Sequence, residues 1–386
     1  MSQTNGPTKR HVTKQAVRPL NNGDGLVSTL VAASVAPATR RAYASDWQRF
    51  AAWCSARGID ALLAGEDSMA TYVAEASTAV DEVGDWVVAS STLQRWISGI
   101  NQVHAAAGGV VPGRSELVRR TLAGVRRTRA TPARRRRPLR VGELRAIVTR
   151  ARLDAAGWTC EIRAARDAFV LLAGYFGAFR SAELVALAVG DVMLEHDGLR
   201  VAVRRSKTDQ VAVGTTKGLP QTTAADLCPV CAWVRWRHLV DAHDAGGRPA
   251  LIAHLEATAD AGWNGNEHLC QEQPAPPVRS DRAVLIRRLG SAGWISSEGV
   301  AANAVNYVVR HRATAAGLSA AVVERLGAHS LRAGFVTDAY AAGASDGEVM
   351  RQTGHRSITQ VRAYQRDAPM VGNAVTRLDP DRHHRP

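Results

Sequence analysis

Six side chains of four types in this sequence have the chemistry for displacement at a phosphodiester without a metal ion. They are Arg180, Lys207, His329, Arg332, His355 and Tyr364. Arginine guanidinium groups fit the non-bridging oxygens of a phosphate in a bidentate fashion. A tyrosine hydroxyl can attack phosphorus, and a lysine can protonate the leaving sugar oxygen because its pKa shifts readily. Histidines can move protons or stabilise developing charge near neutral pH.

The spacing of these residues favours one shared site. His329 and Arg332 lie three positions apart, so one helical turn presents both to the same phosphate. Arg180 and Glu183 have the same separation. We expect the Glu183 carboxylate to orient a neighbouring cation.

The lysines of this chain are few enough to be informative. The chain has four lysines and 45 arginines, so a lysine within the folded body suggests a chemical role. Lys207 lies in a turn expected between two short strands, at 199–205 and 211–213, whose apolar residues alternate. Lys207 is therefore the expected general acid, and Lys217 is the alternative.

A small all-α domain is predicted ahead of the catalytic residues. Apolar residues recur at helical spacing in the segments 39–54, 69–76, 91–107 and 116–127. Thr39 is the expected cap of the first of these helices. Residues 1–25 are polar and are expected to form a disordered tail, which leaves 26–128 as the first domain.

An arginine-rich linker is predicted at 129–140. The surrounding segment 114–150 contains thirteen arginines and two acidic residues. The linker contains Pro132 and Pro138, which argue against a helix there. Between these prolines lie Arg134, Arg135, Arg136 and Arg137. We expect these arginines to contact DNA phosphates, the alternative being a solvated spacer.

A catalytic domain is predicted over 141–367, followed by a polar tail at 368–386. Helices are expected at 141–153, 161–176, 231–241, 302–316, 331–342, 347–353 and 358–365. Residues 244–280 are rich in glycine, proline and polar side chains, and they are expected to form an irregular insertion.

The charge balance points to a polyanionic partner. The chain has 49 basic and 35 acidic residues, a net charge of +14, which is typical of nucleic-acid-binding proteins. Five cysteines, an odd number, argue against a disulfide framework and favour a reducing compartment. The longest apolar run, 168–179, is too short to span a bilayer.

One cysteine pair has the spacing of zinc ligands. Cys228 and Cys231 are separated by two residues, but a structural zinc site takes four ligands, usually from two such pairs. The remaining cysteines, Cys54, Cys160 and Cys270, are scattered along the sequence. We therefore expect no metal site, and we expect this pair to begin a helix and pack in the core.

Taken in order, these segments resemble the tyrosine recombinase (phage integrase) family. The matching pieces are Arg180-Ser-Ala-Glu183-Leu, the hairpin 205–210, His329-Ser-Leu-Arg332, Gly354-His355-Arg-Ser and, nine residues after His355, Tyr364. The helical segment 27–128, opening on Thr39-Arg40-Arg41-Ala-Tyr43, resembles the core-binding domain of the family. The resemblance covers residues 26–366. One departure is Ala333, where the family often has a histidine.

The resemblance implies a mainly α fold of the DNA breaking-rejoining enzyme type. Its first part is an N-terminal all-α core-binding (SAM-like) domain. Its second part is a mainly α catalytic domain with a small β-sheet or hairpin. The two domains are expected to clamp the duplex, with Arg40 and Arg41 of the first domain and the arginine-rich linker on the DNA backbone.

The resemblance also implies a role for each catalytic residue. Tyr364 is the nucleophile, which forms a 3′-phosphotyrosyl bond and leaves a 5′-hydroxyl. Arg180 and Arg332 clamp the scissile phosphate, and Lys207 protonates the leaving 5′-oxygen.

The remaining implications concern support, cofactors and partners. His329 and His355 assist proton transfer and charge stabilisation, and Glu183 maintains the geometry of the site. No cofactor, metal or nucleotide is implied. The expected partners are double-stranded DNA and other copies of this chain, as a homotetramer on two DNA sites that is a monomer or dimer when free. The expected compartment is the bacterial cytoplasm, at the nucleoid and away from membranes. The polar tail and the segment 244–280 favour a recombinase that serves a mobile element. A phage or island integrase, a transposon recombinase and a chromosome-dimer resolvase all stay open within this class.

Two alternative functions stay open at this level. One is a non-catalytic DNA-binding accessory protein, against which the presence of all six catalytic residues argues. The other is a type IB topoisomerase-like enzyme, which shares the chemistry but relaxes DNA without a second site.

Overall fold

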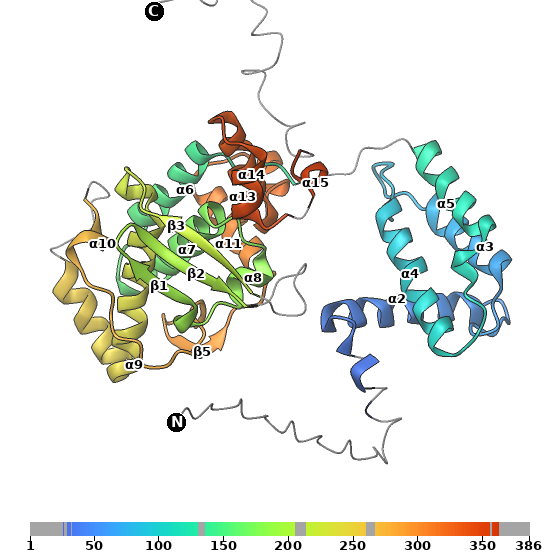
Figure 1. Ribbon diagram of the computed structural model, residues 1–386, viewed down its shortest axis with the longest axis horizontal. Coiled ribbons are helices and arrows are strands. Elements are labelled where there is room, and N and C mark those ends of the chain that lie inside the picture. Colours follow the sequence, from blue (N-terminus) through green and yellow to red (C-terminus); the bar gives the residue numbers. More distant parts are fainter. Residues whose placement is uncertain are drawn as a thin grey trace, which may run out of the picture. The chain divides into compact units, whose positions relative to one another are not determined.

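The structure is a computed structural model of the 386-residue chain. It describes residues 26, 29–31, 33–129, 136–204, 214–259, 267–355 and 357–362. The chain divides into two compact units, Met1–Arg134 and Arg135–Pro386, whose elements are labelled in Figure 1. The boundary between them falls within the arginine-rich segment 129–140.

Unit 1 is helical in its described residues. Its elements are α2 (Pro37–Ser55), α3 (Glu66–Thr78), α4 (Ser90–Ala106), the short 3₁₀ turn η1 (Pro112–Arg114) and α5 (Glu116–Arg129). The helices predicted between 39 and 127 are confirmed, but the prediction that Thr39 caps the first one is wrong. Helix α2 begins two residues earlier, at Pro37, because a proline at the first helical position lacks only an N–H that would have no partner there.

The core of unit 1 is formed by the faces that periodicity predicts. The buried face of α4 includes Leu93, Ile97, Ile100 and His104. Phe50 and Cys54 of α2 are fully buried against the same cluster. Unit 1 therefore has a hydrophobic core of its own.

The described residues of unit 2 are mainly helical, with two small antiparallel sheets. Its helices are α6 (Val141–Leu153), α7 (Trp158–Phe176), α8 (Ser181–Val185), α9 (Pro229–Ala259), α10 (Leu269–Glu272), α11 (Ala304–Ala315), α12 (Ala320–Glu324), α13 (Ala328–Ala341), α14 (Asp346–Thr353) and α15 (Ile358–Arg362). Its strands are β1 (Val192–Glu195), β2 (Gly198–Val203), β3 (Thr215–Pro220), β4 (Arg287–Leu289) and β5 (Ile295–Gly299). The predicted fold class, mainly α with a small β-sheet, is confirmed.

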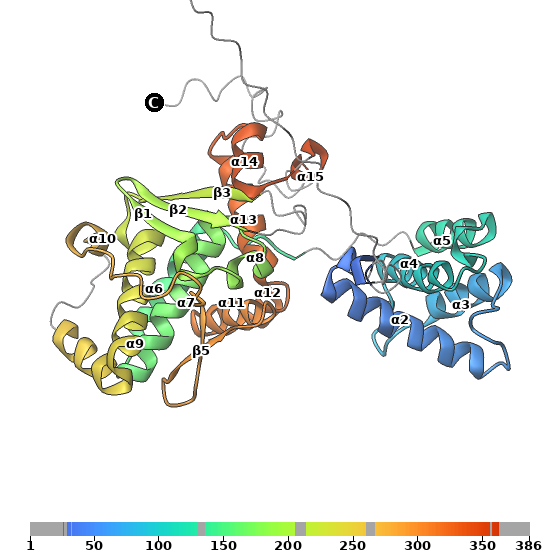
Figure 2. The same cartoon turned by 60° about the horizontal axis from the view of Figure 1, so that its bottom comes forward.

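The three-stranded sheet places one lysine among apolar residues. Its order is β1-β2-β3, and Val201 of β2 lies opposite Lys217 of β3. Side chains alternate between the two faces of a strand, so Lys217 shares the buried face with Leu219. Figure 2 shows this sheet extending toward α14, which contacts β3.

The strand predictions are only partly right. Strand β2 is where periodicity predicts it, whereas the second predicted strand, 211–213, lies outside the described residues and β3 begins at Thr215. Strands β1, β4 and β5 were not predicted. These strands have three to five residues each, which is too short to show alternation clearly.

The prediction of an irregular segment over 244–280 is wrong for its first part. Helix α9 continues to Ala259 across a break in helical geometry at Gly246 and Gly247. Leu251 and Leu255 are one helical turn apart and buried, so core contacts hold the second half of the helix in place despite its glycine-rich start.

The end of the predicted linker packs on unit 2. The Leu139 N–H donates to the carbonyl of Ser330 (3.0 Å), and Leu139 is fully buried. The close approach depends on Gly334, since a methyl group there would lie 1.8 Å from the Leu139 carbonyl oxygen. Helix α13 is therefore held on one side by the chain entering unit 2, and α7 packs against it as well.

No helix within the described part of the chain has the length and apolarity needed to cross a membrane.

Candidate active site

The turn between α7 and α8 organises the candidate site. Gly177 ends α7, and Ala178 adopts a φ of 44°, in the left-handed region that non-glycine residues rarely occupy. In this conformation the successive carbonyl groups of Gly177 and Ala178 both point toward buried cationic side chains. The Ala178 carbonyl accepts from a guanidinium nitrogen of Arg332 (2.6 Å), and that of Gly177 accepts from Lys217 Nζ (2.7 Å).

Arg180 and Glu183 form the pair that their spacing suggests. The Glu183 carboxylate accepts from the Arg180 backbone N–H (3.0 Å) and from its guanidinium (2.6 Å). The Glu183 side chain is buried, whereas the Arg180 side chain retains 24% of its exposure. Arg180 is thus oriented by a buried acid while part of its guanidinium remains accessible.

Arg332 and His355 are brought together from two helices. Arg332, on α13, is 1% exposed, and its second terminal nitrogen lies 2.9 Å from His355 Nε2. A guanidinium can only donate, so Nε2 accepts and the ring proton lies on Nδ1. Burial lowers the pKa of His355 to about 4, and the charges of Arg332 and Arg180 act in the same direction.

His355 is positioned by the end of α14. Gly354 closes that helix in the left-handed conformation, with φ of 68°, and His355 follows directly. The glycine is the predicted turn element of the Gly-His pair. It lets the chain reverse toward Arg332 at little steric cost.

His329 differs from these residues in its burial. It is exposed in the first turn of α13, three residues before Arg332. Asn306 supports this turn, since its side-chain oxygen accepts from the Ala328 N–H (2.8 Å). His329 is near enough to His355 for its charge to contribute to the lowered pKa of that residue.

Lys217 is the lysine that the structure places in this cluster. It is 4% exposed, and its ammonium lies 4.7 Å from the centre of the Phe179 ring. Burial lowers the pKa of Lys217 to about 7; Glu183 opposes this shift, while Arg332 and Arg180 add to it. Lys217 was expected only as the alternative general acid, although its alternation with Leu219 is a usable signal of burial.

Gln352 is a structural element of the site that the sequence analysis missed. Its amide donates to the carbonyls of Phe176 (2.7 Å) and Gly218 (2.9 Å). One side chain on α14 thereby joins the end of α7 to β3. No feature of the local sequence marks a glutamine for such a role, because both partners are distant in the chain.

Four of the predicted site residues, Tyr364, Lys207, Arg134 and Arg135, lie outside the described residues. Their assigned roles stay predictions.

The other predicted DNA contacts differ from one another. Arg40 and Arg41 are exposed on α2. Arg136 donates to the Glu324 carbonyl (2.8 Å), and Arg137 forms an ion pair with Glu143 (2.8 Å). These last two arginines therefore help to attach the start of unit 2 to its own fold.

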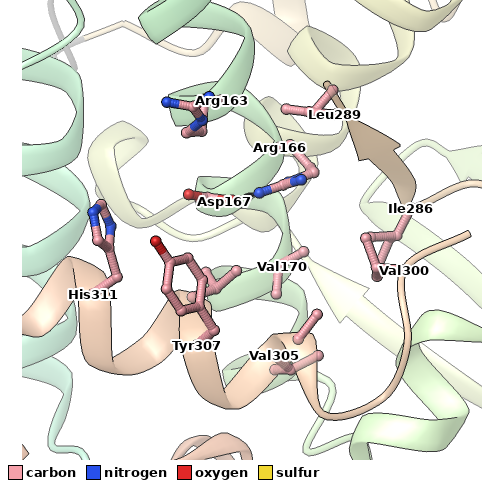
Figure 3. Close-up of a pocket in the computed structure, with 12 residues that line it drawn as sticks. Arg163, Arg166, Asp167, Val170, Ile286, Leu289, Val300, Val305, Tyr307 and His311 are labelled. Carbon is pink, nitrogen blue, oxygen red and sulfur yellow. Dashed lines mark hydrogen bonds and ion pairs between the residues drawn. The ribbon is translucent and has the colours of Figure 1, made fainter. Parts of the chain in front are cut away.

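A cavity of about 380 Å³ in unit 2 is separate from this cluster. Figure 3 shows Tyr307 and His311 of α11 across from Arg163 of α7, with Asp167 beside them. Asp167 is already paired with Arg166 (2.7 Å) and with a further buried arginine. The four predicted catalytic residues that the structure describes, Arg180, His329, Arg332 and His355, do not line this cavity.

One of the three cysteines that are scattered along the sequence lies beside the Cys228–Cys231 pair in space. The structure brings Cys270 and His268 to the Cys228–Cys231 pair, with the four ligand atoms within 4.8 Å of one another. The pair does begin α9 and is buried, as predicted. Cys231 and His268 are separated by 36 residues in the sequence, so linear spacing does not reveal that they meet.

One curated relative is similar to this chain over most of the length of both proteins. No family model matches the chain. The integrase/recombinase xerD homolog of Selenomonas ruminantium is 25% identical over 334 residues, which are 86% of this chain and 82% of that protein.

Two solved structures are similar at lower identity. XerH site-specific recombinase, bound to difH substrate in a pre-cleavage complex, is matched over 84% of this chain and 74% of that chain, with 16% identity and a TM-score of 0.47. The Tn1549 transposon integrase, in complex with transposon right end DNA, is matched over 84% and 86%, with 12% identity and a TM-score of 0.44. Because both TM-scores lie below 0.5, neither structure supports a functional conclusion.

Proposed function

We propose that this chain, a member of the tyrosine recombinase family, cuts and rejoins double-stranded DNA at specific sites through a 3′-phosphotyrosine intermediate. The observation that carries the proposal is the convergence of Arg180, Arg332, His355 and Lys217 around one turn of unit 2. They come from segments that lie far apart in the sequence. Their chemistry suits one phosphate.

The electrostatics of the cluster favour an anionic ligand. The positive charges of Arg332 and Arg180 contribute to the lowered pKa values of both His355 and Lys217. A phosphodiester bound to the two guanidinium groups supplies negative charge at this point. We expect bound DNA to raise both pKa values, since a nearby opposite charge favours the protonated form.

The proposed nucleophile is Tyr364. Its oxygen attacks the scissile phosphorus, the bond from phosphorus to the 5′-oxygen breaks, and the 3′-phosphate stays on the tyrosine. Helix α15 is described over Ile358–Arg362, and Arg362, two residues before Tyr364 in the sequence, forms an ion pair with Asp346 of α14 (2.7 Å). The chain leading to Tyr364 is therefore anchored to the helix that precedes His355.

The proposed general acid is Lys207, which donates a proton to the departing 5′-oxygen. Lys217 has a different proposed role. It donates hydrogen bonds to the carbonyls of the turn between α7 and α8, and so fixes the turn to which Arg332 also binds. Rejoining is the reverse reaction, in which a 5′-hydroxyl attacks the phosphotyrosine. The reaction needs neither ATP nor a catalytic metal, since the phosphotyrosyl bond conserves the energy of the broken linkage.

The proposal extends to assembly and biological role. We propose that four copies of the chain act on two DNA sites, and that the protein integrates a mobile element. A joining assay between two labelled duplexes tests this extension. Relaxation of supercoiled DNA without joining would favour a type IB topoisomerase-like activity instead.

A covalent-trapping assay tests the core of the proposal. Wild-type protein and the Tyr364→Phe variant are mixed with nicked duplexes taken from DNA flanking the coding sequence, then denatured. We expect a protein–DNA adduct with the wild type alone, which peptide mapping assigns to Tyr364.

Two results would contradict the proposal in different ways. Salt-sensitive binding without any adduct across the flanking DNA would favour the accessory-protein alternative. An adduct that persists in Tyr364→Phe would keep the class of reaction but disprove the assignment of the nucleophile.

A further inference from the structure

We infer that Cys228, Cys231, His268 and Cys270 form a structural zinc site in unit 2. All four belong to the described residues, and their ligand atoms lie within 4.8 Å of one another. Three thiols and one imidazole are a ligand set that Zn²⁺ prefers, and four protein ligands make a closed site with no open position for catalysis. The site is separate from the cluster around Arg332 and does not depend on the proposed function.

The distances among Cys231, His268 and Cys270 are close to those of a tetrahedral site. Zinc–sulfur bonds of about 2.3 Å and zinc–nitrogen bonds of about 2.0–2.1 Å place neighbouring ligands about 3.6–3.8 Å apart. The Cys231 and Cys270 sulfurs are 3.4 Å apart, and His268 Nδ1 lies 3.5 Å from the first and 3.8 Å from the second. A small outward movement of the two sulfurs therefore accommodates the ion.

The imidazole is oriented as a zinc ligand. Its Nδ1 faces the sulfurs, while its Nε2 lies 3.4 Å from the carbonyl oxygen of Thr223. Metal-bound histidines commonly donate their other ring N–H to a carbonyl, which fixes the tautomer and the ring plane. The contact is long for a hydrogen bond, and it has the direction that this arrangement requires.

The charge of the surroundings also fits. Three thiolates and one Zn²⁺ carry one net negative charge. Arg152 of α6 is half-buried, and it is close enough to Cys228 and Cys231 to interact with them electrostatically. A zinc–thiolate centre gives this guanidinium a favourable neighbour.

A disulfide explains the cluster less well. A sulfur–sulfur bond is about 2.0 Å long, far shorter than the separation of the Cys231 and Cys270 sulfurs. A disulfide between them also does not explain why a third thiol and an imidazole lie beside it. Within the described residues, Cys54 and Cys160 lie outside the cluster.

The site has a clear structural task. Cys228 and Cys231 begin α9, whereas His268 and Cys270 belong to the start of α10. A zinc ion at this point ties the returning chain to the first turn of α9. We infer that the metal stabilises the inserted part of unit 2.

Metal analysis of the purified full-length chain tests the inference. Protein prepared in reducing buffer is expected to contain about one zinc ion per chain. Cys231→Ser and His268→Ala are expected to lose most of it. The matched control is Cys160→Ser, an exposed cysteine outside the cluster, which is expected to retain the metal.

Cobalt substitution keeps the test independent of variant folding. Wild-type protein stripped of metal and given Co²⁺ is expected to show the intense visible bands of tetrahedral cobalt and a thiolate-to-cobalt charge-transfer band. A chelator is expected to lower the melting temperature of the wild type and of Cys160→Ser, but not that of Cys231→Ser.

Three outcomes would overturn the inference. The first is folded wild-type protein that contains no zinc and shows no cobalt bands after reconstitution. The second is a disulfide within the cluster in protein isolated with its thiols blocked. The third is iron with the visible absorption of an iron–sulfur cluster in place of zinc. Because none of these measurements uses DNA cleavage, they remain decisive even if the proposed recombinase activity fails.

Discussion

Arg332 and Lys217 share one acceptor, the carbonyl oxygen of Ala178, at 2.6 and 3.4 Å. Two buried cations are thus held close together by backbone dipoles, with Glu183 near them as a compensating acid. This arrangement preorganises positive charge before DNA arrives, so the site does not have to reorganise during the reaction.

The different roles proposed for Lys207, the general acid, and Lys217, which holds the turn carbonyls, can be tested with a modified leaving group. Lys207→Ala is expected to cleave normal DNA at least about a hundredfold more slowly, because a general acid contributes that much. Replacing the bridging 5′-oxygen with sulfur is expected to restore its rate, since a thiolate departs without a proton. Lys217→Met is expected to be slowed equally on both substrates.

The opposite pattern of rescue by sulfur would exchange the roles assigned to Lys207 and Lys217. If sulfur rescues Lys217→Met and leaves Lys207→Ala slow, Lys217 is the general acid. The measurement is the single-turnover rate of adduct formation, with the wild type on both substrates as the control.

The buried ammonium also predicts a pH dependence of stability. The pKa of Lys217 in the folded chain is about 7, below its ordinary value of 10.5, so the unfolded chain binds more protons between these values. The free energy of unfolding of the wild type should therefore rise with pH across this window. Relative to Lys217→Met, we expect a rise of about 2 kcal/mol between about pH 7 and about pH 9.

Urea unfolding of both proteins at the two pH values measures this difference. The comparison with Lys217→Met removes the contributions of all other titrating groups that the two proteins share. Parallel pH dependences for the two proteins would show that Lys217 keeps an ordinary pKa in the folded chain.

Among the elements, helix α13 connects the site to the rest of unit 2. It carries His329 and Arg332 on its first turns and packs against α7 and the segment before α6. The contact with that segment is closest at Gly334, so the position of α13 depends on the absence of a side chain there.

Gly334→Ala is expected to be strongly destabilising. The new methyl group would lie 1.8 Å from the Leu139 carbonyl oxygen, so the backbone of α13 or of the segment at Leu139 would have to move. Overpacking of this kind costs about 1–3 kcal/mol or more, and we expect lower cleavage activity because Arg332 moves with the helix.

The matched control is Gly124→Ala. Gly124 lies in α5 of unit 1, and a methyl group there meets no atom within 4 Å. The Gly124→Ala substitution should raise the stability of unit 1 by about 0.5–1 kcal/mol, because alanine favours a helix more than glycine does. The melting temperatures of both variants test this contrast. If Gly334→Ala is as stable as Gly124→Ala, the contact between α13 and the segment at Leu139 can adjust to an added methyl group.

The charge of the whole molecule bears on DNA binding more than on the fold. The chain carries a net charge of +14, and Arg40 and Arg41 are exposed on α2 of unit 1. Contacts to DNA phosphates release counterions, so the logarithm of the binding constant should fall linearly with the logarithm of salt concentration.

Replacing Arg40 and Arg41 with alanine should weaken DNA binding and reduce the salt slope by about one for each phosphate that the protein no longer neutralises. Arg119→Ala is the control, because Arg119 is exposed but already paired with Glu116 (2.7 Å). Fluorescence anisotropy across a salt series measures both. An unchanged slope in the double variant would remove α2 from the proposed DNA-binding surface.

Most of the longer helices and the order of the chemical groups follow from the sequence alone. The period of apolar residues predicts α6 at its observed bounds and the buried face of α4, since both depend on interactions repeated along one helix. The same local logic predicts the Arg180–Glu183 pair and the glycine turn before His355. The sequence also names Tyr364 and Lys207, whose roles remain predictions.

Which distant residues meet depends on tertiary packing. The burial of Lys217 beside the turn at Ala178 requires pairing between β2 and β3, and the pair of Arg332 with His355 requires the packing of α13 near α14. The joining of the Cys228–Cys231 pair to His268 and Cys270 depends on the path of α9 and the chain after it. Local patterns encode interactions within one element, whereas these interactions arise from packing between elements, which linear spacing does not record.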